Sequence, residues 1–289
     1  MARLVLHIGT KKTGSTLIQA LLAQNRDRLS STGWSYPDFL QKRNHAEFAL
    51  IFQPRITETH RHYGLTSAAK ITARRRELDG QLSKLVTSRS KWIITSEYFS
   101  SRLITDVQVA EAVGFLRNHF DEIEVVVALR RQEFVLPSVF SQKVKTGFPS
   151  VWSKEFCEKQ RSAIDCERLV DRWARVVGRD SISAIPYLEA KKADPGWLIG
   201  RFAEASGIPI DESWTTPPRS DANRSLSAEE KTPVAVPEMD ASRAVALMVA
   251  MSEPAGPIAW GQPGGRPLAE MRTGLRSRIR ARRKSAVAG

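Results

Sequence analysis

Short apolar runs of strand length recur along the chain and alternate with segments in which apolar residues follow a helical period. The clearest strand-like runs cover residues 4–8, 91–95 and 123–129. Each is rich in aliphatic and β-branched residues, which is typical of strands buried on both faces. The helical period appears in residues 15–22, in residues 107–120, and from Asp165 onward.

Weaker signals extend this predicted order. The first helix is expected to run from Ser15 to about residue 30, where Gly33 ends it, and residues 33–37 have the composition of a second short strand. Residues 67–89 suit an exposed helix, whereas residues 38–66 show no clear period and contain His45, His60 and His62. A last strand is predicted at 181–185, closed by Pro186.

Strands that alternate with helices predict βαβ units. We therefore expect an α/β fold of three layers, with helices flanking a mostly parallel central sheet. In such sheets, ligands bind beyond the carboxyl ends of the strands. Three polar segments fall at predicted strand ends and are expected to form one site: residues 10–16, 96–97 and 130–138.

The turn after the first strand has the composition of a phosphate cradle. It is bounded by Gly9 and Gly14, carries Lys11 and Lys12, and leads directly into a helix that starts at Ser15. Backbone N–H groups of such a turn, together with the positive end of the helix dipole, favour a bound anion. The spacing differs from the loop of nucleotide triphosphatases, because Ser15 stands where G-x-x-x-x-G-K-[ST] requires lysine.

Two motifs together resemble the PAPS-dependent sulfotransferases, and the local sequence texture resembles bacterial members. Thr10–Thr16 resembles the loop that holds the 5′-phosphosulfate of PAPS, and Arg130 with Ser138 matches the arginine and serine that bind the 3′-phosphate. The resemblance covers roughly residues 3–230 and implies a P-loop-like sulfotransferase fold. The cofactor-binding residues that it implies are Lys11, Lys12, Thr13, Gly14, Ser15, Thr16, Arg130 and Ser138.

This chain departs from the family at two positions. Lys11 replaces a proline that many members carry, and Pro137 precedes Ser138. A proline is tolerated in the first turn of a helix, where its missing N–H has no partner in any case. The helix that carries Ser138 is therefore expected to begin close to Pro137.

Sulfuryl transfer needs a cation beside the leaving group and a base that takes the proton of the acceptor. The resemblance assigns Lys12 to the first role. Two residues compete for the second: Glu97, directly after the third strand, and His45, in the irregular segment. We favour His45 on sequence grounds, because an imidazole is basic near neutral pH and this segment has the length of an acceptor-facing loop.

The composition limits the remaining possibilities. The 289 residues, 42% of them hydrophobic, contain no apolar run near the roughly 18 residues of a membrane span. With two cysteines and no metal-ligand spacing, we expect a cytoplasmic protein without a metal. Residues 259–289 hold eight basic residues and one acid, a net +7 of the chain's +13. They are predicted to be a basic tail, able to contact anionic surfaces, behind a domain of residues 1–258.

The leading hypothesis is an enzyme that transfers a sulfuryl group from PAPS to a hydroxyl or amine of a carbohydrate or small metabolite and releases 3′,5′-ADP. Two alternatives stay open. One is a P-loop kinase, which Ser15 argues against. The other is a non-catalytic module that binds nucleotides or polyanions. The oligomeric state is not indicated by the sequence.

Overall fold

The computed structural model describes residues 1–40, 44–87, 90–145, 153–188 and 194–216. Within these ranges, five strands form one sheet in the order β2-β3-β1-β4-β5, and every pairing is parallel. The strands are β1 (Arg3–His7), β2 (Trp34–Ser35), β3 (Lys91–Thr95), β4 (Glu122–Arg130) and β5 (Ile182–Tyr187). The predicted α/β architecture with a parallel central sheet is confirmed.

Eleven helices connect or follow these strands in the described part of the chain. The first six are α1 (Ser15–Gln24), α2 (Arg26–Ser31), α3 (Glu47–Leu50), α4 (Glu58–His62), α5 (Ala68–Leu85) and α6 (Tyr98–Arg102). The others are α7 (Asp106–Arg117), α8 (Gln132–Lys145), α9 (Lys154–Ile164), α10 (Cys166–Val177) and α11 (Pro195–Ser206). None of them combines the length and apolar character that crossing a membrane requires. The predicted domain boundary after residue 258 and the basic tail lie outside the described residues.

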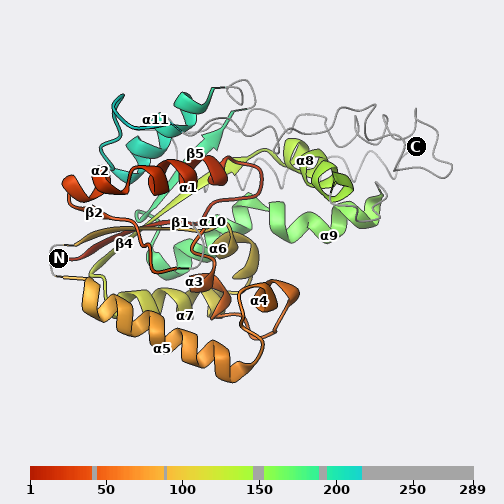
Figure 1. Ribbon diagram of the computed structural model, residues 1–289. Coiled ribbons are helices and arrows are strands. Elements are labelled where there is room, and N and C mark those ends of the chain that lie inside the picture. The colour runs from red at the N-terminus through yellow and green to blue at the C-terminus, as the bar shows by residue number, and fades with distance from the viewer. Residues whose placement is uncertain (41–43, 88–89, 146–152, 189–193, 217–289) are drawn as a thin grey trace, which may run out of the picture. The chain divides into compact units, whose positions relative to one another are not determined.

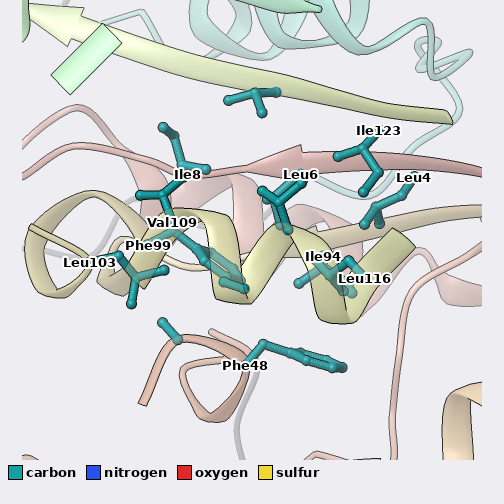
Figure 2. Packing of buried hydrophobic residues seen from close by; sticks show 14 of the residues in the cluster. Leu4, Leu6, Ile8, Phe48, Ile94, Phe99, Leu103, Val109, Leu116 and Ile123 are labelled. Atoms are coloured by element: carbon teal, nitrogen blue, oxygen red, sulfur yellow. The ribbon is translucent and has the colours of Figure 1, made fainter. Parts of the chain in front are cut away.

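Alternation along the strands gives the sheet two separate hydrophobic faces. Val5 and Ile93 pack with α1, α2 and α11, while Leu4, Leu6 and Ile94 pack with α5, α7 and α10. Figure 1 shows α1 and α11 on one side of the strands and α5 and α7 on the other. Since Leu4, Val5 and Leu6 are fully buried, β1 contributes to both faces, as a central strand should. In Figure 2, Leu4, Leu6 and Ile8 lie along the face that Val109 and Leu116 of α7 cover.

Two details of the predicted elements were wrong, although the first helical stretch does end at Ser31, within the expected range. The first helix breaks at Asn25, whose buried side chain donates to the carbonyls of Leu21 (2.7 Å) and Thr215 (3.0 Å). The last strand does not stop at Pro186. It continues to Tyr187, because β5 lies at the edge of the sheet, where a missing backbone N–H costs no ladder hydrogen bond.

The segment predicted to be irregular folds against the core. It contains α3 and α4, and its own small cluster consists of Ala46, Leu50, Tyr63 and Leu65. The buried carboxylate of Glu47 accepts from Arg74 Nε of α5 at 2.8 Å, which ties this segment to the helix behind it. The segment is therefore part of the packed domain and not a loose insertion.

Leu6 gives a direct test of the central strand. Leu6→Ala should lower the free energy of unfolding by about 2–5 kcal/mol, because the side chain is completely buried and leaves a cavity. Leu85→Ala is the matched control, since Leu85 is 47% exposed and its loss should change stability by less than about 0.5 kcal/mol. Urea unfolding followed by circular dichroism measures both. Equal effects would contradict the assignment of β1 to the core.

Candidate functional site

The turn between β1 and α1 has a backbone that only a few residue types adopt. Gly9, Lys12 and Gly14 all have positive φ, at 28°, 65° and 82°. A Cβ on Gly9 would lie 2.4 Å from Ser15 Oγ, and one on Gly14 would lie 2.4 Å from Leu198 Cδ2. Both glycines are thus required by space as well as by conformation. Lys12 is held in the left-handed region without that freedom, which places its carbonyl where Arg130 can reach it.

Two threonines fix the turn to the sheet. Thr10 Oγ1 donates to the carbonyl of Ala128 on β4 at 2.7 Å, and Thr13 Oγ1 donates to the carbonyl of Thr10 at 2.8 Å. Both side chains are buried. The turn is therefore anchored before any ligand arrives, which is the condition for a preorganised anion site.

The start of α1 is suited to an anion. Gly14 is its N-cap and provides no side-chain cap, and the first turn contains no acidic residue. Ser15 is 6% exposed, and among the described residues its hydroxyl has no hydrogen-bond partner. A buried polar atom without a partner is costly, and a phosphate or sulfate oxygen at the helix N-terminus would relieve that cost. Thr16, the last residue of the motif, is exposed.

Arg130 brings the two sequence motifs together. Its Nη1 donates to the Lys12 carbonyl at 3.1 Å and to Ser138 Oγ at 3.1 Å. Arg130 is 4% exposed and Ser138 is 6% exposed, and the guanidinium lies 5.4 Å from the Tyr187 ring centroid. Arg131 behaves differently, since it is partly exposed and pairs with Glu133 at 2.5 Å.

Pro137 does not lie where the sequence argument required it. The helix α8 begins at Gln132, so Pro137 falls in the second turn and not in the first. A proline there removes the backbone donor that would bond to the carbonyl of Glu133. Ser138 still contacts Arg130, since its Oγ accepts the hydrogen bond from Arg130 Nη1 across the first turns of α8.

Glu97 stands at the end of β3, beside the turn. The backbone N–H of Ser96 donates to the carbonyl of His7 at 3.0 Å, which continues the β1–β3 ladder. Ser100 Oγ donates to the carbonyl of Glu97 at 2.9 Å and also to the carbonyl of Gly9. This hydroxyl therefore connects α6, which begins after Glu97, to the turn after β1.

The pKa values of Glu97 and Lys11 shift toward each other. Burial raises the pKa of the Glu97 carboxyl, while Lys11, Lys12 and Arg102 oppose that shift. Burial lowers the pKa of Lys11, opposed by Glu97 and assisted by Arg102 and Lys143. Each of these charges therefore lies near enough to Glu97 or Lys11 to act on its pKa. A carboxylate with a raised pKa in a cationic setting is suited to accept a proton.

His45 lacks the properties that favoured it on sequence grounds. It is 1% exposed, its Nδ1 accepts from the backbone N–H of Thr95 at 3.2 Å, and its ring lies 4.5 Å from the Tyr36 ring. Burial, with a contribution from the nearby Arg26 guanidinium, lowers the pKa of His45 to about 3. The expectation that this imidazole is exposed to an acceptor and basic near neutral pH was wrong.

Sequence reasoning missed three residues of this region: Thr10 as an anchor, Ser100 as a connector, and Arg102. Only Thr10 belongs to a motif. Ser100 and Arg102 carry no signal in the sequence, since their positions depend on a helix of five residues. A small pocket beside the turn is lined by Thr10, Lys11, Arg130, Asp165 and Cys166, among others. Within the described residues, no three His, Cys, Asp or Glu side chains group closely enough to hold a metal.

Three solved structures to which this chain is similar are described as sulfotransferases. A sulfotransferase from Alicyclobacillus acidocaldarius is 14% identical, with 85% of this chain and 92% of that chain covered and a TM-score of 0.45. The sulfotransferase domain of the Synechococcus PCC 7002 olefin synthase is 14% identical, covering 87% and 95%, with a TM-score of 0.41. The sulfotransferase domain from the curacin biosynthetic pathway is 10% identical, covering 87% and 98%, with a TM-score of 0.43. No protein-family model and no curated protein matches the chain.

Two buried histidines make stability depend on pH. Burial lowers the pKa of His7 to about 4 and that of His45 to about 3, against an ordinary value of 6.5. Below pH 6.5 the unfolded chain binds protons that the folded chain does not, so the free energy of unfolding should fall as the pH falls. At pH 5, about 1.5 units below the ordinary pKa, each histidine should lower the free energy of unfolding by about 2 kcal/mol.

Urea unfolding between pH 8 and pH 5 measures the slope of the free energy of unfolding against pH. His45→Asn should flatten it, because asparagine tolerates the left-handed backbone of this position but does not titrate. The slope is informative even if the variant is less stable at every pH. A slope unchanged in His45→Asn would mean that His45 is accessible to protons in the folded chain.

Proposed function

We propose that this protein is a sulfotransferase that uses PAPS as donor and a hydroxyl as acceptor. The observation that carries the proposal is the contact of Arg130 with both Lys12 and Ser138. Two motifs that lie more than a hundred residues apart in sequence, and that resemble the two phosphate sites of one nucleotide, share a single buried guanidinium. A kinase or a simple anion-binding loop would not need this connection.

In this proposal the turn after β1 holds the 5′-phosphosulfate. The donors are the backbone N–H groups of residues 13–16, the ammonium groups of Lys11 and Lys12, and the hydroxyl of Ser15, which has no partner among the described residues. Arg130 and Ser138 supply charge and hydrogen bonds for the 3′-phosphate, which an arginine fork suits well. These donors are fixed by packing and by the threonine anchors, so little reorganisation is needed on binding.

The reaction itself is a displacement at sulfur. The acceptor oxygen forms a bond to sulfur, the bond from sulfur to the 5′-phosphate oxygen breaks, and 3′,5′-ADP leaves with the electron pair. Lys12 lies in the turn where this negative charge grows, and so it is assigned to stabilise the leaving group. The proton of the acceptor hydroxyl passes to the Glu97 carboxylate.

Glu97 is the better base of the two candidates for physical reasons. Its pKa is raised by burial, and it faces the lysines of the turn. His45 is enclosed by Tyr36 and by the end of β3, and its Nδ1 is already occupied by the Thr95 N–H. We assign His45 to packing, where it supports the strand that presents Glu97.

Calorimetric titration with nucleotides tests donor binding. The protein should bind 3′,5′-ADP at least tenfold more tightly than 5′-AMP, and Arg130→Ala should weaken 3′,5′-ADP binding by about 1.5–3 kcal/mol while affecting 5′-AMP little. Arg131→Ala is the matched control, because that arginine is partly exposed and pairs with Glu133. Preferential binding of ATP with Mg²⁺, or an Arg130→Ala variant with unchanged affinity, would refute the donor assignment.

The base is tested by Glu97→Gln and His45→Asn, each assayed for transfer of labelled sulfate from PAPS and for 3′,5′-ADP binding. Glu97→Gln should lose about 10²–10⁴ in rate and keep the nucleotide. The transfer rate of the wild-type protein should also fall as the pH is lowered through the pKa of Glu97, which burial raises above the ordinary value of 4.5. Near-normal turnover in Glu97→Gln would exclude it as the base, whatever His45→Asn does.

A further inference from the structure

One positive charge near Glu97, that of Arg102, is not used by the proposed donor site, and it indicates what kind of acceptor fits there. In the proposed donor site, the turn and Arg130 account for the two phosphate positions. Arg102, at the end of α6, is assigned to neither of them. It acts on the pKa values of both Glu97 and Lys11, so its charge reaches the same region.

Arg102 is positioned by neutral groups. Its Nη2 donates to Thr59 Oγ1 of α4 at 3.2 Å, and its guanidinium lies 5.6 Å from the centroid of the Tyr98 ring. Within the described ranges, its Nε is buried without a hydrogen-bond partner, and no carboxylate lies within ion-pair distance of Arg102, although its charge acts on Glu97. An oxyanion that reaches the half-buried guanidinium would accept charge-assisted hydrogen bonds from it.

The geometry of α6 separates this charge from the reacting atoms. Glu97 is the N-cap of α6, and Arg102 is its last residue. Residues 97 and 102 lie five positions apart, about 7.5 Å along the helix axis. Because the Arg102 charge also acts on the Glu97 carboxyl, an acceptor whose hydroxyl meets Glu97 can place a second group at Arg102.

We propose that the acceptor carries an anionic group and that Arg102 binds this group. The substrate class is a hydroxylated carbohydrate or small metabolite that bears a carboxylate or another oxyanion. Arg102 is then a specificity-determining residue, with Tyr98 and Thr59 holding its fork in place. Lys143, which also acts on Lys11, adds positive charge to the same region. This inference rests on the proposed sulfotransferase function.

A matched pair of acceptors tests it. 4-Nitrophenyl β-D-glucuronide and 4-nitrophenyl β-D-glucoside differ only in a carboxylate or a hydroxymethyl group on the sugar ring. Binding of each is measured by calorimetry on protein saturated with 3′,5′-ADP, and transfer is measured with labelled PAPS. The glucuronide should be preferred by about tenfold or more in both measurements.

Variants then assign the preference to Arg102. In Arg102→Gln the ratio of kcat/KM for the two acceptors should fall toward one, and Arg102→Lys should recover part of it, because the charge returns without the fork. Arg61→Gln is the control, since Arg61 is exposed on α4, near Thr59 in sequence. It should keep the full ratio. Thermal unfolding and 3′,5′-ADP affinity of each variant show whether a loss is confined to the acceptor.

The outcomes separate the two levels of the proposal. If the wild type binds 3′,5′-ADP but does not prefer the glucuronide, or binds neither acceptor, the inference about the acceptor is overturned and the donor assignment stands. If Arg102→Gln keeps the full preference, Arg102 is not the determinant. If 3′,5′-ADP itself does not bind, both the proposed function and this inference fail.

Discussion

The contact of Arg130 with the Lys12 carbonyl and the Ser138 hydroxyl is the interaction on which the site depends. A single guanidinium at the end of β4 holds the turn after β1 and the start of α8 in one arrangement. Three features place it there: Arg130 is the last residue of β4, Lys12 has a left-handed backbone, and α8 begins only two residues later, at Gln132. Because a buried charge is tolerated only with good hydrogen bonds, these three segments constrain one another.

The sheet gives these segments their common edge. All described strands are parallel, so the carboxyl ends of β1, β3 and β4 lie at the same end of the sheet. Because β1 lies between β3 and β4, the turn that follows β1 lies between the segments that follow β3 and β4. Thr10 attaches the turn to β4, and Ser100 attaches it to α6. The groups that would hold a donor and the carboxylate that would deprotonate an acceptor are thereby fixed relative to each other through backbone carbonyls, which are less mobile than side chains.

Local patterns predicted the parts of this structure that depend on neighbouring residues. The strands at 4–8, 91–95 and 123–129 were visible as apolar runs, because a parallel sheet covered on both faces needs little alternation. The spacing of Arg130 and Ser138 likewise survives an unexpected Pro137 in the second turn of α8. What could not be predicted depends on distant segments. Asn25 breaks a helix by bonding to Thr215, and His45 is enclosed by Tyr36 and β3.

The central place of β1 also affects how the chain folds during synthesis. Arg3, in this first strand, pairs with Lys91 and with Glu122, so both neighbours of β1 are made long after it. A ribosome that adds about 5–20 residues per second needs on the order of ten seconds to reach β4. Until residues 91–95 are made, the apolar strand has no partner on either side, and its second side stays open until residues 122–130 follow. Until both neighbours are made, the apolar side chains of β1 stay exposed, and exposed apolar surface of this kind favours aggregation.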